Sequence, residues 1–159
     1  MKTFEKSQLS IEFRRVSEVA IIYRNHVKPA DRPKISSSKD AYEIFRDSWD
    51  STMEYSESFR ILLLNRANKA LGITTVSTGS LSGTIVDVRI IMQYALKGNA
   101  HALILAHNHP SGNKNPSEND ISITQKIKEA GKLLDIQVLD HIILTPDDIY
   151  YSFADEGLL

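Results

Sequence analysis

Apolar residues follow two different spacings along this chain, and the spacing predicts which segments are strands and which are helices. Several short segments are rich in β-branched and apolar residues and are bounded by turn residues, which is typical of strands. These segments are residues 16–23, 59–64, 71–77, 100–106, 136–144 and 149–153. The turn residues over 65–69 suggest that the strands on either side of them form a hairpin.

Three other segments place apolar side chains at the three- and four-residue spacing of a helix. These helices are expected to begin after Ser37, Asp87 and Ser117. An aspartate three residues after each of the two serines would complete a capping box, and Asp87 can cap its helix by itself. The second helix is expected to run to Lys97, with Gly98 as the C′ residue that ends it.

Helices alternate with strands from residue 37 to residue 144, which predicts an α/β fold with a mixed sheet flanked by helices. The length of 159 residues suits one domain with a short extension. Residues 24–35 carry Pro29 and Pro33 among charged residues, a pattern typical of an extended linker. The predicted organisation is therefore an N-terminal strand and linker over residues 1–35, followed by a domain over residues 36–159.

Charge and composition narrow the classes of function. Lys and Arg number 19 and Asp and Glu number 20, and the net charge of -1 gives no chain-wide attraction to nucleic acid or to anionic membranes. The chain has no cysteine, which excludes disulfides, cysteine-ligated zinc and a thiol nucleophile. The first ten residues lack the apolar core of a signal peptide, and no apolar run is long enough to span a bilayer. We therefore expect a cytoplasmic protein with no membrane partner.

Two histidines and an aspartate lie near one another in sequence, after the predicted strand over residues 100–106. His107 and His109 are two residues apart, so at the end of a strand their side chains leave on the same side. Asp120 follows in the first turn of the next predicted helix and is a candidate third ligand. Three protein ligands with one open position are typical of catalytic zinc sites. The alternative is that Ser117 and Asp120 form only a helix cap, which would by itself explain both residues.

The stretch from His107 to Asp120, HNHPSGNKNPSEND, resembles the signature of the JAMM (MPN) metallohydrolases. That signature is His-x-His, seven residues, Ser, two residues and Asp, and here Pro110 directly follows the second histidine. More narrowly, residues 36–159 resemble the RadC-type branch of this JAB domain family, through HNHPSG, PSxxD, KEAGKLLDIQVLDHIIL and YYSFADEG. The resemblance implies a single JAMM/MPN-like, cytidine deaminase-like domain.

The resemblance also implies a role for each residue of the motif. One zinc ion would be held by His107, His109 and Asp120. Ser117 would support the oxyanion of a tetrahedral intermediate by a hydrogen bond. The general base of the family matches Glu57 in SESFRILLL, with Glu54 as the alternative, since a carboxylate beside zinc can accept and relay the proton of an acidified water.

The function implied by the resemblance is a zinc-dependent hydrolase, a metallopeptidase or isopeptidase acting on a peptide or protein substrate. Asn108 stands between the histidines where many active JAMM peptidases have Ser or Thr, although Asn is usual in the RadC-type branch. One alternative is a DNA-repair-associated RadC-like factor, but residues 1–35 do not resemble the helix-hairpin-helix module of full-length RadC proteins. Another is a non-catalytic interaction module, in which the strand over residues 16–23 could pair with another copy of the chain, as a homo-oligomer, or with a different chain.

Two further residues match the family pattern. His141 lies in the strand LDHIIL, and we expect a buried histidine that is hydrogen-bonded near the site rather than a fourth metal ligand. Arg89 lies at the start of the second helix, where a buried salt bridge is expected and contact with a substrate carboxylate is the alternative.

Overall fold

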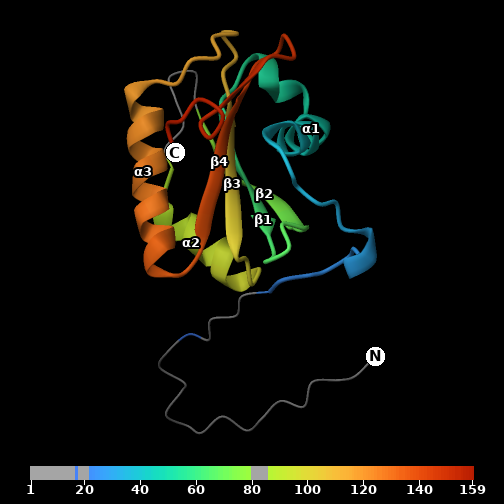
Figure 1. Ribbon diagram of the computed structural model, residues 1–159. Coiled ribbons are helices and arrows are strands. Elements are labelled where there is room, and N and C mark those ends of the chain that lie inside the picture. The colour runs from blue at the N-terminus through green and yellow to red at the C-terminus, as the bar shows by residue number, and fades with distance from the viewer. Residues whose placement is uncertain (1–16, 18–21, 80–85) are drawn as a thin grey trace, which may run out of the picture.

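The computed structural model describes residues 17, 22–79 and 86–159 (Figure 1). The strands are β1 (Ser58–Leu64), β2 (Ala70–Thr78), β3 (Ala102–Asn108), β4 (Gln137–Leu144) and β5 (Tyr150–Ser152). The α-helices are α1 (Ser38–Ser48), α2 (Val88–Lys97) and α3 (Glu118–Leu133). Two short 3-10 helices, η2 (Pro29–Asp31) and η3 (Ser51–Glu54), lie on either side of α1 in the chain. None of the helices described is long and apolar enough to cross a membrane.

The five strands form one mixed sheet in the order β2-β1-β3-β4-β5. β3 and β4 run parallel, whereas the β1–β2, β1–β3 and β4–β5 pairs are antiparallel. Parallel neighbours need a crossover connection, and α3 provides it between β3 and β4. This arrangement confirms the predicted α/β class with a mixed sheet flanked by helices.

The helices cover both faces of the sheet, with α1 on one side and α3 on the other (Figure 1). Phe45 of α1 lies in the core cluster of the first face, together with alternate residues of β1 and β3. Ile91 of α2 and Ile127 of α3 lie in the cluster of the second face. The central strands β1 and β3 are therefore buried on both faces, which explains the apolar runs over residues 61–64 and 102–106.

The predicted caps form at all three α-helices. Ser37 and Ser117 each make a capping box with the aspartate three residues later, and the Asp87 side chain accepts from the backbone N–H of Arg89. The prediction for Gly98 is wrong in detail. Gly98 is the C-cap of α2 with right-handed backbone angles, and Asn99 is the residue with positive φ. A Cβ at position 98 would lie 2.6 Å from Cδ1 of Leu63 and 3.1 Å from the carbonyl oxygen of Tyr94, so a larger residue there would require the Leu63 side chain to shift.

The strand predicted over residues 100–106 is shifted by two residues, since β3 runs from Ala102 to Asn108. His107 pairs with Phe59 of β1 and with Ile143 of β4, so the sheet extends beyond the end predicted for this strand. Much of the strand predicted over residues 16–23 lies outside the described residues, and its described residues Ser17, Ile22 and Tyr23 are not in a strand.

Candidate metal centre

The candidate ligands come together because β3 ends where α3 begins. His107 is the second-last residue of β3, His109 follows the strand directly, and Asp120 is in the first turn of α3. In a parallel β–α–β unit the helix after a strand starts at the carboxyl end of that strand, which is where α/β proteins usually carry their sites. The connection between β3 and α3 is visible at one end of the sheet in Figure 1.

The three side chains converge on one point. Nε2 of His107 lies 2.9 Å from Nε2 of His109 and 3.2 Å from Oδ1 of Asp120. Nε2 of His109 lies 3.6 Å from Oδ2 of Asp120. His107, His109 and Asp120 form a group whose ligand atoms all lie within 4.8 Å of one another, close enough to bind one metal ion. The structure thus brings together the three residues that the sequence predicted as ligands.

The hydrogen-bond partners of His109 test whether this group suits a cation. Nδ1 of His109 lies 2.6 Å from the backbone carbonyl of Asn113, which can only accept, so Nδ1 carries the proton. Nε2 of a neutral His109 then carries a lone pair, and it points at another imidazole nitrogen and at a carboxylate. Basic atoms that face one another at these distances need a proton or a cation between them. The donor set therefore fits a metal ion.

The carboxylate and the imidazoles perturb each other's ionisation. Burial opposes the charged form of Asp120, but the adjacent imidazoles of His107 and His109 outweigh it and hold the pKa of Asp120 far below its ordinary value. Burial likewise opposes protonation of His109, but hydrogen bonds with Asp120 and Asn113 raise its pKa above the ordinary imidazole value. In the metal-free protein the charged form of His109 is therefore favoured more than in an ordinary imidazole, and its second proton lies where a metal would bind.

This proton predicts how metal affinity depends on pH. A metal must displace the proton of His109, whose pKa is raised, whereas Asp120 stays ionised and adds no pH dependence. As the pH is lowered, we expect zinc affinity to begin to fall at a pH above ~6.5, the ordinary imidazole pKa, because the pKa of His109 is raised. Below the pKa of His109 the affinity should drop about tenfold for each pH unit. Chelator-competition titrations between about pH 5.5 and pH 8.5 measure this. An affinity that stays constant across that range would exclude His109 as a ligand.

Ser117 and Asp120 make both the helix cap and the candidate metal group. The backbone N–H and the hydroxyl of Ser117 each donate to Oδ2 of Asp120 at 2.7 Å, while Oδ1 faces His107. The two interpretations of Asp120 are therefore compatible, because the cap orients the carboxylate toward the histidines. The hydroxyl proton of Ser117 is engaged by Asp120 in this arrangement.

A cavity of about 510 Å³ opens over the three candidate ligands. Its other lining residues are Glu57, Phe59, Val86, Ser117, Asn119, Ser122, Ile123 and Lys126. Glu57 lies just before β1, and its negative charge contributes to the raised pKa of His109. Glu54, the alternative base, is exposed at the end of η3 and is not part of this lining. The structure thus places Glu57, and not Glu54, on the cavity that the ligands share.

Asn108 connects the segment around Glu57 to the histidine strand, a role that sequence reasoning missed. Its side-chain carbonyl accepts from the backbone N–H of Ser58 at 2.8 Å. Its amide donates to the carbonyls of Ser56 and Met53, each at 2.9 Å. Strand alternation offered a signal, because Asn108 must point to the opposite side from its neighbouring histidines. Asn108 therefore anchors the residues on both sides of Glu57.

The sequence prediction for His141 agrees with the structure, whereas the prediction for Arg89 does not. His141 is fully buried and lies 2.8 Å from the ring of His107, so it is the buried, hydrogen-bonded histidine that the sequence predicted. Arg89 pairs with Asp87 at 2.7 Å, but its side chain is 87% exposed. The expected buried salt bridge is wrong, because the first turn of α2 directs this side chain into solvent. Arg89 is also absent from the lining of the cavity over the ligands.

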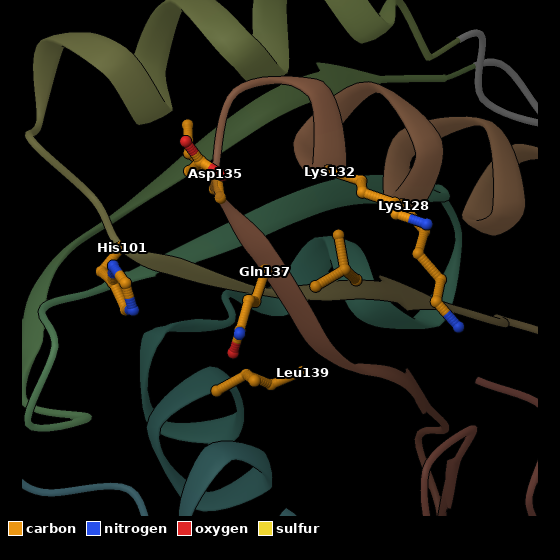
Figure 2. Close-up of a pocket in the computed structure, with 8 residues that line it drawn as sticks. His101, Lys128, Lys132, Asp135, Gln137 and Leu139 are labelled. Atoms are coloured by element: carbon orange, nitrogen blue, oxygen red, sulfur yellow. The ribbon is translucent and has the colours of Figure 1, made fainter.

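A second cavity, of about 410 Å³, lies at the opposite end of β3 and β4 (Figure 2). Figure 2 shows Gln137 and Leu139 on β4, His101 in the segment before β3, and Lys128 and Lys132 on α3. Among the described residues, the cluster of metal-ligating side chains lies at the other end of the strand. This cavity is therefore separate from the candidate metal centre.

Comparison with known proteins gives the family. The RadC-like JAB domain family matches residues 35–158 of the chain. A UPF0758 protein of Flavobacterium johnsoniae is 48% identical over 79% of this chain and 53% of its own length. UPF0758 proteins of Porphyromonas gingivalis and Desulfitobacterium hafniense are 43% and 38% identical, over 80% and 82% of this chain and 56% of their own length. The chain thus spans about half the length of the curated relatives it matches.

The extent of this match agrees with the fold and with the convergence of His107, His109 and Asp120 at the end of β3. The match begins at residue 35 and takes in every strand of the sheet and all three α-helices. On these grounds the chain belongs to the RadC-like JAB domain family.

Proposed function

We propose that this protein is a zinc-dependent hydrolase of the metallopeptidase or isopeptidase type. The observation that carries the proposal is that Glu57 lines the same cavity as His107, His109 and Asp120. Two imidazoles and one carboxylate are a ligand set found in catalytic zinc sites. Bound there, zinc would supply a Lewis acid and a water molecule whose pKa is lowered to about 7.

The other residues of the cavity have roles that follow from their positions. Glu57 would accept a proton at its carboxylate and later deliver it to the leaving nitrogen, as a general base that becomes a general acid. Ser117 would donate a hydrogen bond to the developing oxyanion, which requires its hydroxyl to turn away from Asp120. Asn108 would hold the backbone around Glu57 at a constant distance from the histidines.

The proposal is tested by metal analysis together with a cleavage assay. We expect about one zinc ion per chain after dialysis, and cleavage in a peptide library read by mass spectrometry. Cleavage should stop when a chelator removes the metal and return when zinc is added. If the protein binds zinc but cleaves no peptide, the assignment of the metal centre would stand and the proposed peptidase activity would be contradicted.

Two further measurements test the alternative functions, a nucleic-acid factor and a non-catalytic interaction module. Binding to DNA that weakens steeply with salt would support a nucleic-acid factor, although the net charge of -1 provides little attraction. A folded protein without bound zinc that forms dimers in light scattering would support an interaction module.

A further inference from the structure

A chain of hydrogen bonds runs behind the candidate ligands, from the backbone of α3 to the ring of His107. The hydroxyl of Thr124 donates to the backbone carbonyl of Asp120 at 2.5 Å. The same oxygen lies 2.6 Å from Nδ1 of His141, and Nε2 of His141 lies 2.8 Å from Nδ1 of His107. Thr124 and His141 are 1% and 0% exposed, so water does not reach these contacts.

The direction of each hydrogen bond follows from the single proton of the Thr124 hydroxyl. The carbonyl of Asp120 can only accept, so that proton is used in the bond to it. Nδ1 of His141 must then carry the proton in its contact with Thr124. A neutral His141 has one ring proton, so its Nε2 carries a lone pair and accepts from Nδ1 of His107. Nε2 of His107 is left with a lone pair facing Asp120 and His109.

The surroundings of His141 favour its neutral form. The ring of Phe153 stacks on it with centroids 4.7 Å apart, and the ring of Phe59 makes an edge-type contact with centroids 5.4 Å apart. Among the described residues, its two nitrogens have hydrogen-bond contacts with the hydroxyl of Thr124 and the imidazole of His107, neither of which is negatively charged. A buried imidazolium without an anionic partner carries a large desolvation cost.

We propose that Thr124 and His141 are positioning residues that keep the proton of His107 on Nδ1, so that Nε2 is free to bind the metal. The inference rests on the proposed metal site but not on the reaction. The contacts also form a closed circuit, since Thr124 bonds to the backbone of Asp120 and the carboxylate of Asp120 faces His107. The circuit therefore joins α3, β4 and β3 behind the site.

Replacing Thr124 by valine removes the hydroxyl while keeping the shape of the side chain. The proton on Nδ1 of His141 would then lack an acceptor in a buried position, which is costly. Moving that proton to Nε2 lets His141 donate to His107, whose own proton must then move to Nε2. A metal would have to displace it, so we expect zinc affinity to fall roughly 10–100-fold, as for other outer partners of metal ligands.

Two measurements test the proposal, with Thr124→Ser as the matched control because it keeps the hydroxyl. Long-range ¹H–¹⁵N NMR of metal-free protein at about pH 8 reports which nitrogen of each histidine is protonated. We expect Nδ1–H on His107 and His141 in the unaltered protein and in Thr124→Ser, and Nε2–H on both in Thr124→Val. Chelator competition should show weaker zinc binding in Thr124→Val alone.

The outcomes separate this proposal from the proposed hydrolase. An NMR spectrum that shows Nε2–H on His107 of the unaltered protein would overturn the proposed role of Thr124 and His141. This measurement needs neither a variant nor a metal. Unchanged tautomers and unchanged zinc affinity in a folded Thr124→Val would overturn it as well. Absence of peptide cleavage would contradict the hydrolase and leave the tautomers as proposed.

Discussion

Asp120→Asn is expected to abolish stable zinc binding while leaving the protein folded. The substitution removes the negative charge that faces both imidazoles and leaves a neutral amide in its place. Loss of an outer partner of a metal ligand typically lowers affinity about 10–100-fold, so loss of a charged direct ligand should exceed that range. Zinc per chain by elemental analysis, with competition titrations for the affinity, measures the effect.

The chain contains its own matched control for this experiment. Ser37 and Asp40 form the same capping box at α1 that Ser117 and Asp120 form at α3. Asp40→Asn changes the same chemical group at the same helix position, and we expect it to weaken only the cap of α1 without altering zinc binding. Equal zinc content in the two variants would mean that Asp120 is only a helix cap.

Glu57→Gln is expected to lower hydrolysis by about 10²–10⁴-fold, the usual contribution of a general base, with the zinc content unchanged. The amide keeps the size of the side chain but cannot accept the proton. Glu57 lines the cavity and has no hydrogen bond to the three candidate ligands, so its replacement should not disturb them. Initial rates on the substrate found in the peptide library, beside elemental analysis, measure both quantities.

Glu54→Gln is the control for Glu57. Glu54 precedes Glu57 by three residues, is exposed and lies outside the cavity lining, so its replacement should leave the rate unchanged. A rate that is normal in Glu57→Gln and reduced in Glu54→Gln would reverse the assignment of the base. Normal rates in both variants would mean that neither carboxylate is the base.

Local spacing was sufficient to identify the candidate ligands and to predict most elements. His107 and His109 must leave a strand on one side, and Asp120 must sit in the first turn of the helix that Ser117 caps. These features depend on a few neighbouring residues, so they can be recognised without knowing the rest of the fold. The same holds for the apolar sequence of β1, which a strand buried on both faces requires.

Contacts between distant segments were decided only by the packing. Whether Asp120 was a cap or a ligand depended on the return of α3 beside the end of β3, and its carboxylate serves both purposes. Arg89 had the right neighbour in Asp87 but not the expected burial, because the direction of α2 sets its exposure. The extension of β3 through His107 depended on pairing with β1 and β4.

The sequence by itself determined the α/β class, the helix caps and the three candidate ligands of this protein. The tertiary structure alone decided what supports them, through the bonds of Asn108 around Glu57 and the contacts of Thr124 and His141 with His107. The physical reason is the range of the interactions. Caps and ligand spacing follow from the geometry of a few consecutive residues, whereas a hydrogen bond between β3 and β4 exists only once strand register brings its two partners together.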